Sequence, residues 1–387
     1  MNTPVKKTIS SKLPNTGLSI FSVMTQLADE HKAVNLSQGF PDFMPDEKLL
    51  KLVTKHMAAG HNQYAPMQGV LKLRKKIAER TQQHYGLEVD PELEVTITAG
   101  GTQAIYTAIT ASIREGDEVI IFEPSYDSYI PAIKLNQGIP RTIELKAPDF
   151  KINWNEVKKL LTIKTRMIII NSPHNPTGAM LDEADMKALN TLVAGTDILV
   201  LADEVYEHIH FDGRLHESVA RYPALYNQSF IIRSFGKSSH TTGWKIGYCL
   251  APAYLSLEFR RVHQFLVFSV NSPMQHAFAD YLDDQTSFAE LSGFYQQKRD
   301  LFASLLKDSA FDLLPVSGTY FQLASFAGIS DEKEKDFAIR LTKEFGVACI
   351  PLSSFYTNQR EHKLVRFCFA KTDATLEKAA LLLNTIK

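Results

Sequence analysis

The sequence predicts an α/β protein with a mainly parallel central sheet, helices on both faces of that sheet, and a smaller α+β domain. Between about residues 70 and 285, short continuous apolar runs alternate with helix-like or loop segments. This alternation is typical of a parallel sheet buried on both faces. After about residue 285 a long helical segment and a mixture of strands and helices replace the pattern. That change indicates the second domain.

Periodicity places each element along the chain. The first ~20 residues are polar and broken by prolines, which predicts an arm. The large domain is expected to contain helices at 70–85 and 100–114 and strands at 94–99, 118–122, 167–170, 198–202, 230–232 and 246–250. The small domain is expected to contain helices at 288–307 and 332–344, strands at 320–323, 347–350 and 363–369, and a final helix. We assign residues 1–45 to the arm and part of the small domain, 46–284 to the large domain, and 285–387 to the rest of the small domain.

The composition excludes several classes of function. The chain has 387 residues, of which 44% are hydrophobic and 22% charged, and its net charge is −1. Without a basic excess, neither nucleic acid nor an anionic membrane is expected as a partner. No apolar run approaches the ~20 residues that a membrane span needs.

The cysteines indicate the compartment. Cys249, Cys349 and Cys368 are far apart and lie in apolar runs, so we expect buried free thiols and neither a disulfide framework nor a zinc site. The N-terminal segment has no apolar stretch typical of a secretory signal. We therefore expect a cytoplasmic protein, and no metal site.

Polar clusters follow the predicted strands at the point where each strand ends. They occupy residues 100–103, 123–126, 171–178, 203–206 and 234–237. Ligands of open parallel sheets bind beyond the carboxyl ends of the strands. A TIM barrel gathers its site in the same way, so this observation alone does not decide the fold.

The pair Lys237 and Lys245 is the most informative part of the chain. Lys237 ends the run Ser-Phe-Gly-Lys at 234–237, and Lys245 follows eight residues later. This pattern looks like the Schiff-base lysine segment of an enzyme that uses pyridoxal phosphate (PLP). A second cation or burial lowers the pKa of a lysine amine from ~10.4 and makes it a nucleophile. Taken alone, two such lysines are also typical of a solvated surface.

Candidates exist for the groups that bind the ring of this cofactor. A protonated pyridine nitrogen needs an anion, and Asp203 at a strand end suits this role. Tyr206 is a candidate donor to the phenolic oxygen, Tyr126 is a candidate to stack on the ring, and Asn175 to hydrogen-bond both cofactor and substrate. Each is also compatible with an ordinary loop or turn.

The sequence also contains candidate residues to bind the cofactor phosphate and the substrate carboxylate. Gly101, Thr102 and Gln103 follow a strand and open a helix, whose N–H groups suit a phosphate, and Ser234 and Lys245 add a hydroxyl and a charge. An ordinary strand-to-helix turn is equally compatible with the glycines. Arg366 lies in an apolar strand and suits a substrate carboxylate, or else an internal ion pair.

Taken together, these segments resemble the class I, fold-type I PLP-dependent aminotransferases, from about residue 13 to the end. Within that superfamily the chain is most similar to the bacterial methionine aminotransferases, near the kynurenine aminotransferase and glutamine transaminase branch. The resemblance rests on residues 35–43, 62–66, 171–178, 203–206, 234–237 and 243–248. It implies the PLP transferase fold type I, a ping-pong transfer of an amino group from an amino acid to an α-keto acid, and a homodimer with shared active sites.

The resemblance also implies roles for single residues. Lys237 forms the Schiff base with the cofactor and moves a proton during the reaction, and Asp203 pairs with the pyridinium. Tyr64 reaches the phosphate of the partner subunit's site. Arg366 and Asn175, with the backbone of Gly39, hold the substrate carboxylate. Lys245 departs from the arginine that many aspartate aminotransferases have at this position, which keeps the charge but loses the bidentate fork.

Substrate preference rests on an apolar pocket. The segment 265–270 contains no arginine that would pair with a second substrate carboxylate. Phe21, Tyr64 and Phe268 are expected to line the pocket, so methionine, aromatic residues and glutamine are the expected donors, with methionine favoured.

Several alternatives stay open at this point. A C–S β-lyase of the same fold uses the same lysine, and a PLP-sensing regulator would need a further DNA-binding domain. A serine hydrolase is indicated weakly by the S-x-x-K pattern at 234–237, but its companion motifs are absent from the sequence. Metal catalysis through His208 and His210 lacks further well-spaced ligands.

Overall fold

A computed structural model describes residues 9–14, 16–284 and 286–387. The part of the predicted arm at residues 1–8 lies outside this range. α1 (Ile20–His31) follows directly after the rest of the arm.

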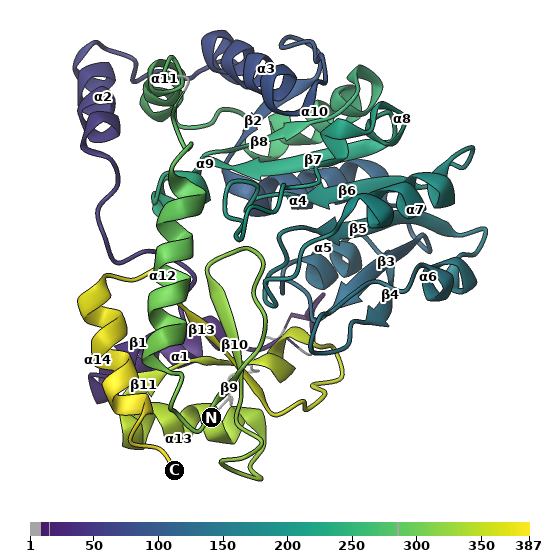
Figure 1. The fold of residues 1–387 in the computed structure, drawn as a ribbon. Helices are drawn as coiled ribbons and strands as arrows, with labels where there is room; N and C mark the ends of the chain where they lie inside the picture. Colours follow the sequence, from purple (N-terminus) through teal and green to yellow (C-terminus); the bar gives the residue numbers. More distant parts are fainter. Residues whose placement is uncertain (1–8, 15, 285) are drawn as a thin grey trace, which may run out of the picture.

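A seven-stranded sheet forms the centre of the large part of the molecule, with the strand order β2-β8-β7-β6-β5-β3-β4 (Figure 1). Its strands are β2 (Val95–Thr98), β3 (Glu118–Glu123), β4 (Ile139–Glu144), β5 (Thr165–Asn171), β6 (Leu199–Asp203), β7 (Ser229–Ser234) and β8 (Gly247–Leu250). The predicted mainly parallel sheet is confirmed, because only β8 runs against its neighbours. The chain returns from β7 to β8 through α9 (Phe235–Ser238) and η2 (Thr242–Trp244), without a crossover helix.

The edge strand β4 was not predicted. It pairs in parallel with β3 through residues that are mostly exposed or half-buried. An edge strand is covered less than a central one and therefore lacks the continuous apolar run that identifies its neighbours.

Strand alternation divides the core into two layers. On one face, Val119, Ile121, Met167 and other alternate residues pack with α4 (Gly100–Ser112), α5 (Tyr129–Leu135) and α10 (Ala253–Leu266). The intervening residues pack in the larger core on the opposite face. That core also takes side chains from α2 (Glu47–Ala58), α3 (Leu71–Tyr85), α6 (Trp154–Leu160), α7 (Glu183–Val193), η1 (Val219–Arg221), α8 (Pro223–Tyr226) and α11 (Ser272–Tyr281).

The second part of the molecule contains two small sheets. One has the antiparallel order β12-β13-β10-β9 and the other pairs β1 with β11. The elements are β1 (Val34–Asn35), α12 (Leu291–Leu305), β9 (Asp312–Leu313), β10 (Phe321–Ser325), α13 (Glu334–Phe345), β11 (Val347–Ala348), β12 (Ile350–Pro351), η3 (Leu352–Phe355), β13 (Leu364–Cys368) and α14 (Asp373–Leu383). The single strand predicted at 347–350 is therefore wrong, since its two halves join different sheets. β9, which was not predicted, has only two residues.

N-terminal and C-terminal segments lie together in this second part. β1 pairs in parallel with β11, placing Val34 opposite Val347, and α12 runs from the large part toward α13 and α14 (Figure 1). This arrangement supports the domain boundaries near residues 45 and 285, which stay predictions.

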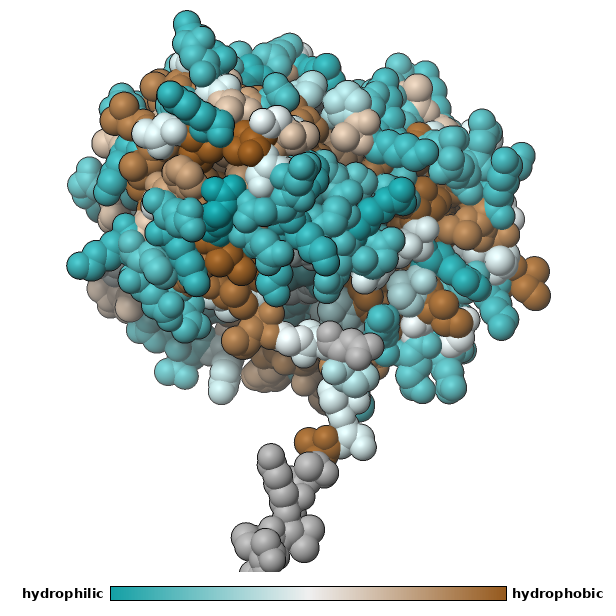
Figure 2. Space-filling model, turned by 90° about the horizontal axis from the view of Figure 1, so that it is seen from below, coloured by the Kyte–Doolittle hydropathy of each residue, from teal (hydrophilic) through white to brown (hydrophobic). Residues whose placement is uncertain are grey.

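The polarity of the surface and the burial of the cysteines are as the sequence predicts. The face seen in Figure 2 is largely hydrophilic, with separate apolar patches between the polar side chains. Across the described ranges, no helix combines the length and the apolar character that a bilayer crossing requires. The three cysteines are free and buried, as predicted.

Candidate active site

A cavity of about 160 Å³ opens at the carboxyl ends of β5, β6 and β7. Nine of the predicted site residues line it, namely Gly101, Thr102, Tyr126, Asn175, Asp203, Tyr206, Ser234, Lys237 and Lys245. They come from segments up to 144 positions apart (from 101 to 245) that the parallel strands bring to one edge of the sheet.

Lys237 is placed in this cavity by the short helix α9. Its Nζ donates to the hydroxyl of Tyr320 at 3.1 Å and to the carbonyl of Gly39 at 3.5 Å. Burial lowers the pKa of Lys237 to about 8, and the nearby cations of Lys245 and Arg366 also lower it. At neutral pH a substantial minority of such an amine is uncharged, which an attack on an aldehyde requires.

Asp203 lies at the end of β6 with 3% of its surface exposed. Burial raises the pKa of this carboxyl to about 6, while a hydrogen bond from the hydroxyl of Tyr129 opposes that rise. The bond is 2.5 Å long. A buried carboxylate with one donor is poised to gain from a cation such as a protonated pyridine nitrogen.

The opposite end of the cavity suits an anion. Gly100 has φ +79°, and a side chain at this position would meet the Nζ of Lys245 at 3.3 Å. A side chain at Gly101 would meet Val205 at 2.9 Å, so both glycines allow a close approach of the backbone at the start of α4. Lys245 itself has the left-handed φ of 56°, which is uncommon outside glycine and directs its amine toward this helix end.

Tyr126 and Thr102 are joined across the cavity wall. The Thr102 Oγ1 and the Tyr126 hydroxyl lie 3.0 Å apart. Gln103 faces elsewhere, because its Oε1 accepts a hydrogen bond from the backbone N–H of Ala99 at 2.9 Å and its amide lies 3.1 Å from the ring of His263. Its side chain is not among those that line the cavity, so a contact with the cofactor stays a prediction.

Arg366 is fully buried on β13 without an acidic partner in the described part of the chain. It donates from Nη1 to the Oδ1 of Asn175 at 2.8 Å and from Nη2 to the carbonyl of Ser37 at 3.1 Å, and its Nε has no partner there. Burial lowers the pKa of Arg366 to about 10. The internal ion pair that the sequence left open is absent among these residues, and a carboxylate ligand would complete the site.

Three further predicted residues lie away from this cavity. Tyr64 and Phe268 have 82% and 55% of their surfaces exposed and form an edge-to-face pair with 5.2 Å between ring centroids. Phe21 packs beside both Arg366 and Phe355, with its ring centroid 5.3 Å from the guanidinium and 6.0 Å from the centroid of the Phe355 ring. Phe21 faces a wide groove that continues past Tyr126.

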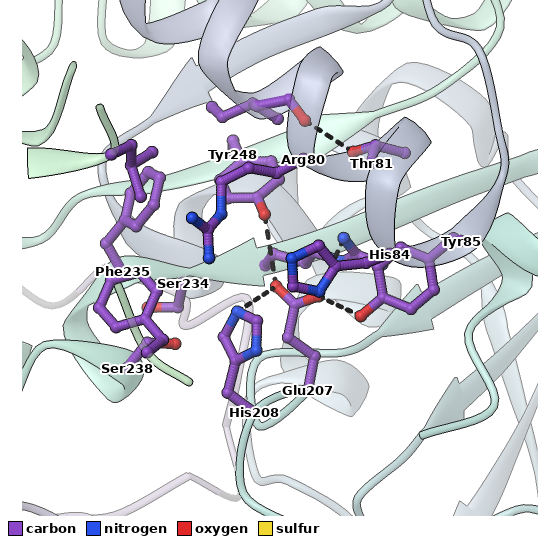
Figure 3. A pocket seen from close by; sticks show the side chains of 14 residues that line it. Arg80, Thr81, His84, Tyr85, Glu207, His208, Ser234, Phe235, Ser238 and Tyr248 are labelled. Atoms are coloured by element: carbon purple, nitrogen blue, oxygen red, sulfur yellow. Dashed lines mark hydrogen bonds and ion pairs between the residues drawn. The ribbon is translucent and has the colours of Figure 1, made fainter. Parts of the chain in front are cut away.

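A buried ionic network supports the strand ends from the opposite face of the sheet. Arg233 on β7 lies 2.9 Å from both the Glu204 and the Glu207 carboxylates. Tyr85 and Tyr248 also donate to Glu207, and His208 lies beside it (Figure 3). The cavity there measures about 20 Å³, which is enough for about one water molecule. This network holds the residues adjacent to Asp203 and Ser234 and is too small to be a substrate site.

The comparisons with known proteins decide the family. A family model of class I and II aminotransferases matches residues 31–382. The chain belongs to this family. Its membership confirms the predicted aminotransferase, its fold and its PLP cofactor, and it overturns the serine hydrolase and metal-catalysis alternatives.

Individual relatives agree over nearly the full length. The aminotransferase is 48% identical to a methionine aminotransferase of Escherichia coli (strain K12), over 96% of each chain. It is 33% identical to a kynurenine–oxoglutarate transaminase of Dictyostelium discoideum, over 96% of this chain and 94% of that one. A crystal structure of an Escherichia coli protein with a methionine aminotransferase function matches with a TM-score of 0.96, covering 98% of this chain and 100% of the other.

The residues present fit PLP. An amine of lowered pKa, a buried carboxylate and a glycine-lined helix end with a cation meet in one cavity of the aminotransferase. PLP supplies an electron sink for bonds at the substrate Cα. Lys237 would hold its aldehyde carbon, Asp203 its ring nitrogen, and the start of α4 with Ser234 and Lys245 its phosphate.

Sequence reasoning missed two tyrosines of this site. Tyr129 contacts Asp203, and Tyr320 contacts Lys237 and donates to the carbonyl of Gly39 at 2.6 Å. Tyr129 lies in a helix and Tyr320 precedes a strand, and neither belongs to a recognisable motif. The only available signal is that a buried tyrosine hydroxyl needs a hydrogen-bond partner, and burial is not visible in the sequence.

Proposed function

We propose that this aminotransferase takes a neutral apolar, sulfur-containing or aromatic amino acid as donor, with methionine favoured, and passes its amino group to an α-keto acid. The observation that carries the proposal is the groove beside Arg366. The described residues that line this groove include Phe21, Tyr126 and Phe355, and its cations are Lys333 and Lys335, with no arginine among them. A second carboxylate on the substrate would therefore lack a bidentate partner.

Asp127 adds a second argument against acidic donors. It lies in the same groove, and burial raises the pKa of its carboxyl, while the charge of Arg366 lowers it. In its ionised form this side chain repels a second substrate carboxylate. The methionine aminotransferase relative in Escherichia coli supports the same preference.

In the proposed mechanism, Arg366 and Asn175 orient the substrate carboxylate, with Asn175 holding the guanidinium in place. Lys237 would hold the aldehyde carbon of PLP until substrate enters, and its free amine would then carry the proton that leaves the substrate Cα, while the bound cofactor would supply the electron sink. The hydroxyl of Tyr320 keeps the Lys237 amine near this path at 3.1 Å. Asp203, which accepts a hydrogen bond from Tyr129, would hold the protonated ring nitrogen of the cofactor.

The test compares donors with one keto-acid acceptor. We expect kcat/KM for methionine, phenylalanine and glutamine to exceed that for aspartate by at least about tenfold, which corresponds to ~1.4 kcal/mol. A far higher value for aspartate would contradict the pocket assignment. Ammonia and thiol released from a cysteine conjugate, without stoichiometric amino transfer, would instead favour the C–S β-lyase.

We also propose a homodimer in which Tyr64 completes the site of the partner subunit. The support is the exposed aromatic and apolar surface around Tyr64, Phe265, Leu266 and Phe268, of which Phe265 is 87% exposed. Mixing inactive Lys237→Ala with impaired Tyr64→Ala subunits should restore activity, because one site of each hybrid dimer is then complete. No recovery after verified subunit exchange would contradict a shared site.

The buried free thiols support a reducing, cytoplasmic location.

A further inference from the structure

Three histidines meet outside the cofactor cavity. Two lie on the packed helices α2 and α11, and the third lies in the turn that follows α2. His56 lies in the last turn of α2, His61 follows that helix, and His276 lies on α11. One ring nitrogen of each lies within 4.8 Å of the others. The rings of His61 and His276 are stacked with 3.9 Å between centroids. Figure 1 shows α2 beside α11 at the end of the molecule opposite the small domain.

The hydrogen bond between His56 and Asp280 occupies one ring nitrogen of His56 and leaves the other without a partner among the described residues. Its Nε2 lies 2.9 Å from the Oδ2 of Asp280, so Nε2 carries the proton and the carboxylate accepts it. Nδ1 is therefore the acceptor nitrogen. His56 is 7% exposed, and its Nδ1 is buried without a partner among the described residues. A buried nitrogen acceptor without a partner is destabilising, and a bound cation would supply the missing partner.

Asp280 stands in the position of the carboxylate that orients a metal-binding histidine. Such a carboxylate accepts the second ring N–H, fixes the tautomer and raises the basicity of the ligand nitrogen. The Oδ2 of Asp280 lies 2.9 Å from the Nε2 of His56, which matches this arrangement.

The backbone already fixes the second ligand. The N–H of His61 donates to the carbonyl of His56 at 3.1 Å, and the side chain of Asn62 donates to the carbonyl of Met57 at 2.9 Å. On α11, His276 and Asp280 are four residues apart and share one face.

We propose that His56, His61 and His276 bind one divalent transition-metal cation of the zinc class per chain, with Asp280 orienting His56. Imidazole nitrogens prefer such cations, while Mg²⁺ and Ca²⁺ need oxygen ligands. The Asp280 carboxylate beside His56 already accepts hydrogen bonds from Lys55 and Lys72 at 3.0 and 2.7 Å. Zinc–nitrogen distances of ~2.1 Å require the three nitrogens to draw together, which the partly exposed rings of His61 and His276 allow.

This site goes beyond amino transfer and differs from the expectation of no metal. It would tie the turn that carries His61 to both helices. Tyr64 follows three residues later, so the cation would also restrain the segment leading to it. A structural, non-catalytic cation is the inferred role, since Lys237 is held by other elements.

The test uses the untagged, PLP-loaded protein. After removal of bound metal with a chelator, isothermal titration with ZnCl₂ should show one equivalent per chain, and zinc should raise the Tm. His61→Ala and His276→Ala should each weaken the affinity at least tenfold and abolish the rise in Tm. His31→Ala, which removes an exposed histidine at the end of α1, is the matched control and should bind as the wild type does.

Loss of zinc binding in the variants can be distinguished from misfolding of the variants. His61 and His276 are partly exposed, so their truncation should leave the cofactor absorption band and the metal-free Tm nearly unchanged. Absence of stoichiometric zinc binding by the wild type, or equal affinity in the wild type and the two variants, would overturn the proposal. Neither result would bear on the aminotransferase assignment.

Discussion

Tyr129 donates a 2.5 Å hydrogen bond to Asp203, and both side chains are buried, Tyr129 at the start of α5 and Asp203 at the carboxyl end of β6. The bond opposes the rise in the pKa of Asp203 that burial causes. It therefore keeps the carboxylate ionised near neutral pH, where a protonated cofactor nitrogen needs a negative partner.

Tyr129→Phe removes this donor, and we expect the Kd for PLP to rise about 10- to 100-fold. A hydrogen bond to a charged group is worth ~1.5–3 kcal/mol. The pKa of Asp203 should also rise further above 6, so the acid limb of cofactor binding should move to higher pH. Spectroscopic titration of the apoenzyme at several pH values measures both effects. Tyr254→Phe, which removes an exposed hydroxyl bonded to a backbone carbonyl, is the control and should change neither.

Lys245→Gln should weaken phosphate binding and raise the pKa of Lys237. Lys245 is a cation close to the start of α4, and its charge is one of the causes that lower the pKa of Lys237. The neutral amine reacts with the aldehyde, so reconstitution of wild-type apoenzyme should accelerate as pH rises through about 8 and then level off. In the variant the midpoint should shift to higher pH. An unchanged midpoint, as expected for the exposed control Lys48→Gln, would contradict this coupling.

Arg366→Lys keeps the positive charge but loses the planar fork. We expect kcat/KM for every amino-acid donor to fall about 100-fold, because hydrogen bonds to a charged carboxylate are worth ~1.5–3 kcal/mol each. Cofactor binding should stay within about twofold, which separates the carboxylate role from a general loss of structure. Arg340→Lys changes a half-buried arginine paired with Glu332, and steady-state kinetics should show nearly wild-type rates for it.

Glu204→Gln should lower the free energy of unfolding by ~3 kcal/mol, since it leaves the buried Arg233 with one carboxylate fewer. Despite burial, the charge of Arg233 and hydrogen bonds lower the pKa of Glu204 to about 2 from its usual 4.5. The stabilisation is therefore complete above pH 4.5 and declines as pH falls toward 2. Urea unfolding at neutral and acidic pH should show the two proteins converging in acid. The exposed Glu258→Gln should cost less than ~1 kcal/mol.

Local pattern predicted most of the large sheet, because its central strands are buried on both faces. The expected strand at 118–122 matches β3, and the helix at 70–85 matches α3 within one residue. β4 was not predicted because an edge strand needs no continuous apolar run. The segment 347–350 was predicted as one strand because two short strands in succession have the same apolar pattern as one. The direction of β8 depends on the path of the chain through α9 and η2, which periodicity does not report.

By itself, the sequence determined where the chemistry lies. Strand ends marked by Asp203, Ser234 and the glycines before Thr102 have to meet at one edge of a parallel sheet, so their neighbourhood follows from local signals. Tertiary packing decided the rest: Tyr129 reaching Asp203, Arg366 lying without an acidic partner among the described residues, and His56 meeting His276. These contacts join elements far apart in the chain, and the distance and orientation between packed elements are set by the whole core and not by any short run of residues.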